Sequence, residues 1–241
     1  MPHERRAVVL AGGFGTRLRQ ALPDLPKPLA PVAGKPFLEW VLRFLKKQGV
    51  TKVIVSSGYK SEAIAESAGK MAIAELRIRC CPEPQPLGTA GGFLNAISGE
   101  PKGEPWLVCN GDSLALAPLE PLYAALERGA DAAILGLEMS DAARYGRLET
   151  AQGGRLKSFV EKRPGPATIN AGVYLLSEKA VTHFPAQRPL SFETDVFPCL
   201  IKDSVDIQVA AAEAAAPFLD IGTAESLGQA EAFIAANQAA F

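Results

Sequence analysis

A glycine-rich segment near the start of the chain has the composition of a site that holds phosphate groups. It follows a short apolar run and reads Leu10-Ala11-Gly12-Gly13-Phe14-Gly15-Thr16-Arg17-Leu18. Glycines let the backbone turn tightly, and the backbone amides of such a turn can surround an anion. Two cations come soon after, at Arg17 and at Lys27 in Pro26-Lys27-Pro28-Leu29. Amides followed by cations favour a nucleoside triphosphate as the ligand.

Two common phosphate-binding motifs do not fit this segment. A dinucleotide fingerprint starting at Gly13 would need glycine or alanine at the position of Leu18, and a Walker loop would need Gly-Lys-Ser/Thr. A glycine-rich loop on its own is also compatible with an ordinary turn that carries solvated basic residues. The remaining motifs of the chain must therefore decide between a simple turn and a phosphate site.

The scarcity of histidine limits the chemistry further. The chain has 2 histidines, His3 and His183, and the first lies close to the amino terminus. The chain therefore offers few residues for catalysis by histidine bases or by metals with histidine ligands. We expect carboxylates, cations and backbone amides to carry any reaction.

The composition is typical of a globular protein without a polyanionic partner. Of the 241 residues 48% are hydrophobic, and 25 Lys and Arg residues against 26 Asp and Glu residues give a net charge of -1. This balance provides no bulk field to attract nucleic acid or a membrane surface. We recognise neither a signal peptide nor a stretch of transmembrane length. We expect a cytoplasmic protein whose cysteines are reduced and mostly buried: Cys80, Cys81, Cys109 and Cys199.

The first half of the chain alternates strand-like and helix-like segments. Apolar residues at helical spacing predict a helix over residues 37–45, which Gly49 stops. Short apolar runs predict strands at residues 7–10, 53–56, 76–80 and 106–109. This alternation indicates a mostly parallel sheet with helices on its faces.

The pattern becomes looser after Asp112. It predicts a helix at residues 118–128, a strand at 132–137 and further antiparallel strands among glycines and prolines. A last strand at 217–221 precedes an alanine-rich helix that Thr223 can cap. We find no linker or repeat. We therefore expect one domain over residues 1–241, an α/β fold with a Rossmann-like, mixed, mostly parallel sheet flanked by helices.

Taken in order, the motifs resemble the signature of the sugar-nucleotide pyrophosphorylases, which are sugar-1-phosphate nucleotidyltransferases. The first part of that signature is the segment from Leu10 to Leu18 with Pro26-Lys27-Pro28-Leu29 and Gly34-Lys35-Pro36. The later parts are Pro86-Leu87-Gly88-Thr89-Ala90-Gly91, Asn110-Gly111-Asp112, Tyr145-Gly146, Glu161-Lys162, Asn170-Ala171-Gly172 and Asp220-Ile221-Gly222-Thr223. The resemblance covers essentially the whole chain and implies the nucleotidyltransferase, glycosyltransferase-A-like fold.

The resemblance also implies a role for individual residues. The nucleotide would lie against Leu10, Ala11, Gly12, Gly13, Gly15, Thr16, Asn110 and Gly111, with its base facing Gln85, Gly88 and Thr89. Catalysis would rest on Arg17, Lys27, Asp112 and Asp220, of which the two aspartates would bind Mg²⁺. The sugar phosphate would be surrounded by Tyr145, Gly146, Glu161, Lys162 and Asn170. Taken singly, these residues have ordinary alternatives as turn residues, helix caps or solvated pairs.

Within the family, three segments are most similar to guanylyltransferases that act on D-glycero-α-D-manno-heptose 1-phosphate. These segments are residues 86–91, 143–146 and 191–193. The resemblance thus implies GTP as the donor and a GDP-heptose for surface polysaccharide synthesis as the product. Many guanylyl-transferring relatives carry glutamate where this chain has Gln85, and we find no hexapeptide-repeat domain after the motifs. Mannose 1-phosphate, or UTP, CTP or dTTP as the donor, stays an alternative.

The chemistry of this reaction suits the residues present. A sugar-phosphate oxygen is already anionic at neutral pH, so no general base is required to attack the α-phosphorus. Catalysis then consists of bringing two polyanions together and stabilising charge, which cations, amides and Mg²⁺ can do. Mg²⁺ prefers one or two carboxylates with phosphate oxygens and water, and Asp112 and Asp220 each end a predicted strand beside a glycine. Strand ends are where ligand sites of open α/β sheets gather.

Three other functions fit the residues less well. A nucleotide-sugar sensor without turnover would not need Arg17, Lys27 and both aspartates. A dinucleotide-binding oxidoreductase is disfavoured by Leu18 and by the lack of a suitably placed acidic residue. A glycosyltransferase would release a nucleoside diphosphate instead of pyrophosphate. The oligomeric state is left open, with a homodimer among the alternatives.

Overall fold

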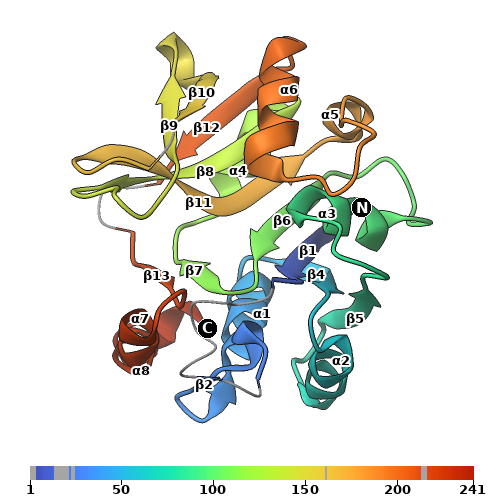
Figure 1. The fold of residues 1–241 in the computed structure, drawn as a ribbon, viewed down its shortest axis with the longest axis vertical. Coiled ribbons are helices and arrows are strands. Elements are labelled where there is room, and N and C mark those ends of the chain that lie inside the picture. The colour runs from blue at the N-terminus through green and yellow to red at the C-terminus, as the bar shows by residue number, and fades with distance from the viewer. Residues whose placement is uncertain (1–3, 14–21, 23–24, 161, 213–215) are drawn as a thin grey trace.

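The fold is built around one large mixed sheet. It is seen in a computed structural model, which describes residues 4–13, 22, 25–160, 162–212 and 216–241. Within these residues the sheet has nine strands, and helices pack on both of its faces (Figure 1). The fold class expected from the sequence is confirmed.

The parallel part of the sheet comes from the first half of the chain. Strand β1 (Arg5–Ala11) lies between β4 (Val50–Ser57) and β6 (Trp106–Asn110), and it is parallel to both. Strand β5 (Arg77–Pro82) adds to β4 in parallel and forms an edge. These are the four strands that the apolar runs predicted. The central strands are buried because helices cover both faces, which is why their sequences are continuously apolar.

The second half of the chain supplies the antiparallel part. The long strand β11 (Ala167–Leu176) runs antiparallel to β6 and to β8 (Ala132–Met139). Strand β12 (Ile207–Ala211) is parallel to β8, whereas β9 (Arg147–Thr150) and β10 (Leu156–Val160) form an antiparallel pair beside β11. The antiparallel strands expected after Asp112 are therefore present.

The two faces of the sheet belong to two separate hydrophobic cores. Along β1, Ala7 and Val9 pack in one core and Val8 in the other, as the alternation of side chains along a strand requires. The first core receives α1 (Phe37–Lys47), α2 (Ser61–Lys70), α4 (Glu120–Glu127) and α8 (Ala230–Ala236). The second receives α3 (Thr89–Ile97), α5 (Glu178–Thr182) and α6 (Phe197–Lys202). Helices α1 and α4 confirm the helices predicted at 37–45 and 118–128.

Shorter elements connect these layers. A 3₁₀ turn, η1 (Lys27–Leu29), precedes the small hairpin of β2 (Pro31–Val32) and β3 (Lys35–Pro36). The others are η2 (Gln152–Gly154), the π-helical turn η3 (Phe192–Val196), α7 (Ala224–Gly228) and the terminal η4 (Gln238–Ala240).

The strand expected at 217–221 is present, but it does not join the large sheet. It is β13 (Phe218–Asp220), which pairs antiparallel with β7 (Ser113–Ala115) in a separate two-stranded sheet. Thr223 then caps α7, as predicted. The end of the chain returns to α1 (Figure 1). There the rings of Phe241 and Trp40 meet edge to face at 5.1 Å between centroids.

The expectation of mostly buried thiols is wrong for three of the cysteines. Cys109 is buried within β6, whereas Cys80, Cys81 and Cys199 are partly exposed. Cys80 and Cys81 belong to β5, an edge strand that has a neighbour on one side only. All four are free thiols. No helix in the described part of the chain has the length and apolar character needed to cross a membrane.

Candidate active site

Two adjoining cavities open where β1 and β6 end. The charged cavity has a volume of about 420 Å³ and is lined by Lys27, Asn110, Asp112, Ser113, Arg144, Tyr145, Lys162, Asn170, Ala171, Phe218, Asp220 and Gly222. The glycine cavity has a volume of about 340 Å³ and is lined by Leu10, Gly12, Gly13, Glu83, Pro86, Gly88, Thr89, Asn110, Asp112 and Glu193. Because Asn110 and Asp112 line both, a ligand in one cavity lies next to a ligand in the other.

The two aspartates meet through the small sheet of β7 and β13. Asp112 follows the carboxyl end of β6, which is where the sequence analysis placed it. Asp220 arrives differently, because β13 pairs with β7 and sets Asp220 opposite Ser113. The backbone amide of Ile221 also donates to the Asp112 carbonyl at 3.0 Å. The convergence predicted for the aspartates is present, but a separate antiparallel sheet produces it for Asp220.

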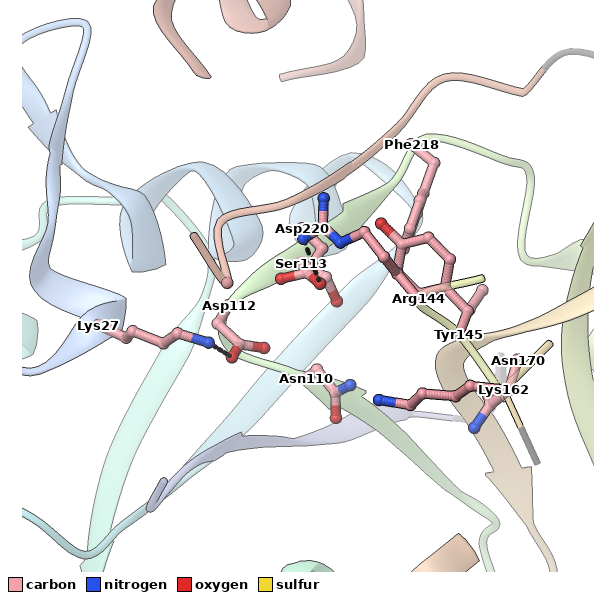
Figure 2. Close-up of a pocket in the computed structure, with 12 residues that line it drawn as sticks. Lys27, Asn110, Asp112, Ser113, Arg144, Tyr145, Lys162, Asn170, Phe218 and Asp220 are labelled. Atoms are coloured by element: carbon pink, nitrogen blue, oxygen red, sulfur yellow. Dashed lines mark hydrogen bonds and ion pairs between the residues drawn. The ribbon is translucent and has the colours of Figure 1, made fainter. Parts of the chain in front are cut away.

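Cations lie against both aspartates. The Lys27 ammonium contacts Asp112 Oδ2 at 2.8 Å, and the Arg144 guanidinium lies 3.8 Å from Asp220 Oδ2 (Figure 2). Lys27 begins η1, and its carbonyl accepts the Ala30 backbone amide at 3.0 Å. Its side chain is largely covered, with 17% exposed, so its charge acts in a setting of weak screening.

Asp220 is the aspartate with a perturbed pKa. Burial raises its pKa, and the nearby charge of Asp112 raises it further, while Lys27 and Arg144 oppose the shift. Two carboxylates that face one cavity and repel each other form a donor set suited to a divalent cation. Among the described residues no cluster of three or more His, Cys, Asp or Glu side chains has metal-binding geometry. A metal held here by Asp112 and Asp220 would therefore complete its coordination with substrate oxygens and water, as Mg²⁺ does.

The residues predicted for the sugar phosphate gather in the charged cavity. Tyr145, Lys162 and Asn170 line it, and Lys162 extends toward Asn110 (Figure 2). The Tyr145 ring meets Phe218 edge to face at 5.4 Å between centroids, so the segment of β13 also supports the sugar side. Gly146 acts through its carbonyl, which accepts the Asn170 backbone amide at 3.0 Å. Glu161 lies outside the described residues.

Backbone and small residues form much of the glycine cavity. Leu10, Gly12, Gly13, Gly88, Thr89 and Asn110 line it, as the resemblance implied for a nucleotide. The Gly111 amide donates to the Leu10 carbonyl at 2.9 Å and holds the ends of β6 and β1 together. Ala11 is buried beside this contact as the last residue of β1. Gly15, Thr16 and Arg17 lie outside the described residues and remain predictions.

Gly88 shows why the turn before α3 needs a glycine. Its φ is +77°, and a Cβ there would lie 2.5 Å from the Leu190 carbonyl oxygen. A side chain would therefore be strained and would also collide with backbone. Without one, the Ala90 amide donates to that same carbonyl at 2.9 Å. This contact fixes the start of α3 at the edge of the glycine cavity.

Glu83, rather than Gln85, reaches the glycine cavity. Gln85 is exposed and lies outside the residues that line either cavity. Glu83 follows the end of β5, and its carboxylate accepts hydrogen bonds from Ser56 Oγ and from the Leu87 amide, both at 3.2 Å. Residues two apart share one face of a regular extended segment, but the chain bends at Pro84 and Gln85, and a sequence does not show in advance which side chain such a bend turns inward.

Further lining residues were not assigned from the sequence. They are Glu83, Pro86, Ser113, Ala171, Arg144, Glu193, Phe218 and Gly222. Most stand next to an assigned residue or inside a quoted motif, so proximity to the motifs was the available signal. Phe218 had no such signal, because only the pairing of β13 with β7 brings it to the cavity.

Known proteins have sequences and folds similar to those of this chain. Mannose-1-phosphate guanylyltransferase of Mycobacterium tuberculosis is 34% identical over 226 residues, which are 92% of this chain and 62% of that protein. D-glycero-alpha-D-manno-heptose 1-phosphate guanylyltransferase of Aneurinibacillus thermoaerophilus is 33% identical over 227 residues, 93% of this chain and 96% of that protein. This chain thus spans less than two thirds of the mycobacterial relative but nearly all of the other.

A solved structure gives the same picture. HddC from Yersinia pseudotuberculosis, in its complex with GMP-PN, superposes with a TM-score of 0.82 at 33% identity, covering 95% of this chain and 98% of that one. The nucleotidyl transferase family itself matches residues 6–237. By sequence and fold, the chain belongs to the nucleotidyl transferase family.

Proposed function

We propose that the protein transfers GMP from GTP to a sugar 1-phosphate and releases pyrophosphate. The preferred sugar in this proposal is D-glycero-α-D-manno-heptose 1-phosphate, and the product is a GDP-heptose. The observation that carries it is the pair of adjoining cavities, one lined by glycines and the other by cations and two aspartates, which share Asn110 and Asp112. Two bound polyanions would meet at that shared wall.

The reaction needs no proton transfer from the protein. An anionic phosphate oxygen of the sugar 1-phosphate forms a bond to the α-phosphorus of GTP. The bond from that phosphorus to the oxygen bridging to the β-phosphorus breaks, and its electron pair leaves with pyrophosphate. The chain has to hold both reactants in line and neutralise their charge. Lys27 and Lys162 stand on the walls where that charge would lie.

Mg²⁺ is part of the proposal. Asp112 and Asp220 would hold it, since both carboxylates face the charged cavity and the pKa of Asp220 is raised by burial and by Asp112. Such an ion would bind phosphate oxygens and stabilise the charge that develops on them. The Lys27 contact to Asp112 would then orient that carboxylate.

The chemistry of Glu83 supports guanine as the base. Guanine presents two neighbouring N–H donor groups on its Watson–Crick edge, and a carboxylate can accept from both. Adenine lacks that donor pair and would set the acceptor at its N1 position against the carboxylate, which disfavours it. Glu83 lines the cavity and is already oriented by Ser56 and Leu87. The guanylyltransferase relatives and the HddC complex with GMP-PN give the same indication.

The choice of sugar rests on the relatives. The heptose-specific relative matches this chain over 96% of its own length, whereas the mannose-specific one matches over 62%, which favours heptose. Mannose 1-phosphate is the second candidate because heptose and mannose share a ring pattern and differ at the exocyclic end. A contact to that one group supplies only about 1–3 kcal/mol of discrimination. We place the reaction in the cytoplasm.

A substrate matrix tests the proposal. GTP, ATP, UTP, CTP and dTTP would each be combined with the 1-phosphates of the heptose, mannose and glucose, with pyrophosphate release as the readout. We expect the highest rate with GTP and heptose 1-phosphate, detectable activity with mannose 1-phosphate and much less with glucose 1-phosphate. A clear optimum with UTP, CTP or dTTP would overturn the guanylyl assignment. Mannose 1-phosphate far above the heptose would establish the second candidate instead.

A further inference from the structure

A buried chain of hydrogen bonds connects the two cavities. Asn170 lines the charged cavity and Glu193 lines the glycine cavity. Between them lies Tyr174, whose side chain is fully buried. The Asn170 Nδ2 atom donates to Tyr174 Oη at 2.9 Å, and Tyr174 Oη donates to Glu193 Oε1 at 3.3 Å. One hydroxyl group therefore links a side chain of the sugar side to a carboxylate of the nucleotide side.

A bulge in β11 makes this chain possible. Between Asn170 and Tyr174 the strand advances by four residues, while its partner β8 advances by only two, from Gly136 to Ile134. In a regular strand, residues four apart are separated by about 13 Å, too far for an asparagine and a tyrosine on one face to meet this closely. The two extra residues shorten that separation, and their even number leaves both side chains on the same face.

Gly172 sits inside the bulge and has a φ of +72°. A Cβ at this position would collide with the side-chain amide of Asn110, the residue that both cavities share. The bulge thus brings Asn170 to Tyr174 and Gly172 to Asn110, beside the wall where the two substrates would meet. Bulges of this kind commonly redirect side chains beside active sites.

The direction of each hydrogen bond in the chain is fixed. An ionised carboxylate can only accept, so the Tyr174 hydroxyl donates to Glu193 and must accept from Asn170. Burial raises the pKa of Tyr174 well above its ordinary value, and the charge of Glu193 adds to the rise, so the hydroxyl keeps its proton. Ser191 Oγ donates to the other carboxylate oxygen at 2.9 Å and holds Glu193 in place.

The same logic fixes the amide of Asn170. Its Oδ1 atom accepts the Gly172 backbone amide at 2.9 Å, and one hydrogen of Nδ2 is used by Tyr174. The second hydrogen of Nδ2 is left to donate to a ligand in the charged cavity. Asn170 therefore presents a donor to that cavity, and turning the amide over would set two donors against each other at Gly172.

We infer that Tyr174 is a positioning residue that, directed by Glu193, holds Asn170 as a hydrogen-bond donor to a hydroxyl oxygen of the sugar 1-phosphate. This inference rests on the proposed function, because it takes the charged cavity as the sugar site. It gives Glu193 an effect on sugar binding even though Glu193 lines the other cavity. Neither Tyr174 nor Glu193 touches the reacting atoms in this scheme.

The central test removes the hydroxyl with Tyr174→Phe. Loss of the net free energy of one hydrogen bond should raise the KM for the sugar 1-phosphate about fivefold. We expect kcat, and the KM for GTP, to stay within about twofold of the wild-type values. Tyr123→Phe is the matched control. The Tyr123 hydroxyl is also buried, but it has no hydrogen-bond partner in the described part of the chain. This control should leave all three constants unchanged.

Glu193→Gln tests the direction of the chain. The variant nearly conserves shape but can donate to Tyr174, which removes the requirement that Tyr174 accept from Asn170. We expect the KM for the sugar 1-phosphate to rise, although the substitution is in the glycine cavity. In an Asn170→Ala background, Tyr174→Phe should have no further effect on that KM, because the group it positions is absent.

Calorimetric titration with mannose 1-phosphate separates this inference from the proposed function. Wild-type protein that binds no sugar 1-phosphate, and releases no pyrophosphate with any, would contradict the proposed function itself. Wild-type protein that binds the sugar 1-phosphate with the same affinity as Tyr174→Phe would overturn the inference alone. Equal changes in the KM values for GTP and for the sugar 1-phosphate in Tyr174→Phe would also overturn the inference. A lower melting temperature of this variant with an unchanged KM for the sugar 1-phosphate would do the same, because either result indicates a merely structural role.

Discussion

The two cavities are adjacent, yet they are built in different ways. The glycine cavity is formed largely by backbone and small residues at the end of β1 and at the turn before α3, together with the carboxylates of Glu83 and Glu193. The charged cavity is formed by side chains from several separate segments, among them Lys27 of η1, Arg144 before β9 and Asp220 of β13. The backbone shape of the glycine cavity can select a ligand, whereas the converging charges of the charged cavity can stabilise the charge that develops during the reaction.

This difference assigns different consequences to substitutions in the two cavities. Changes in the charged cavity should lower turnover, because its groups lie where phosphoryl charge would develop. Changes at Glu83, Gly88 and Thr89 of the glycine cavity should alter which nucleotide is used, because these residues would meet the base, which does not react.

The largest effect is expected from Asp112→Asn and Asp220→Asn. Each removes a carboxylate from the proposed metal site with almost no change in volume, and we expect turnover to fall by about 10³ or more. Asp220→Asn should fold at least as stably as the wild type without metal, because it removes a buried charge that Asp112 repels. Pyrophosphate release and thermal unfolding, each over a Mg²⁺ titration, measure both effects.

Mg²⁺ should raise the melting temperature of the wild type and not that of Asp220→Asn, since a ligand stabilises only a protein that binds it. Near-normal turnover in both folded variants across the titration would refute the metal assignment. It would also remove the main reason for treating the charged cavity as the catalytic one.

Lys27→Ala is expected to have the next largest effect. Lys27 is covered and lies 2.8 Å from Asp112, so its loss removes a preorganised charge from the reaction site. We expect kcat to fall by about 10²–10³, with a smaller change in the KM for GTP. Lys70→Ala is the control, because Lys70 also forms an ion pair, with Glu66, but on an exposed helix surface. A rise in KM with intact kcat would make Lys27 a uniform binding residue instead.

Glu83→Gln tests the other cavity. An amide in place of the carboxylate can accept one hydrogen bond from guanine but opposes its second donor with a donor of its own. We expect the preference for GTP over ATP, measured as a ratio of kcat/KM values, to fall by about tenfold or more. Gln85→Ala should leave that ratio unchanged, because Gln85 is exposed and outside both cavities. The reverse pattern would restore Gln85 as the residue that faces the base.

The same contrast explains what the sequence could predict. The strands β1, β4, β5 and β6 and the glycine turn were predictable because local rules of apolar patterning and backbone freedom determine them. The position of β13 was not, because its partner β7 is about a hundred residues earlier and no local signal distinguishes a small separate sheet from the large one. The bulge at Gly172 was equally hidden, since it exists only relative to the pairing of β11 with β8.

Side-chain direction was the other limit. Asp112 and Lys27 could be assigned by motif, but the choice between Glu83 and Gln85 depends on which residue after β5 turns inward. Exposure of Cys80 and Cys81 depended on β5 being an edge strand, which is a property of the assembled sheet. Motifs therefore predicted which segments reach the site, but they predicted less well which side chains face the cavities.

The smallest effect is expected from Thr223→Ala, which tests how firmly the charged cavity depends on distant support. Thr223 caps α7, with its Oγ1 accepting the Ser226 amide at 3.2 Å while Ser226 Oγ accepts the Thr223 amide at 3.1 Å. Losing this reciprocal cap should cost about 1 kcal/mol of unfolding free energy.

Ser177→Ala is the matched control, because Ser177 caps α5 through the same kind of bond, to the Ala180 amide at 3.2 Å, away from both cavities. Chemical denaturation should therefore show similar losses for the two variants. Only Thr223→Ala should also raise the Mg²⁺ concentration needed for half-maximal rate, because Asp220 lies three residues before the lost cap. Its kcat at saturating Mg²⁺ should stay within about twofold of the wild type. Equal Mg²⁺ dependence in both variants would mean that the pairing of β13 with β7 holds Asp220 without help from α7. The contrast between the two cavities would then rest on the small sheet alone.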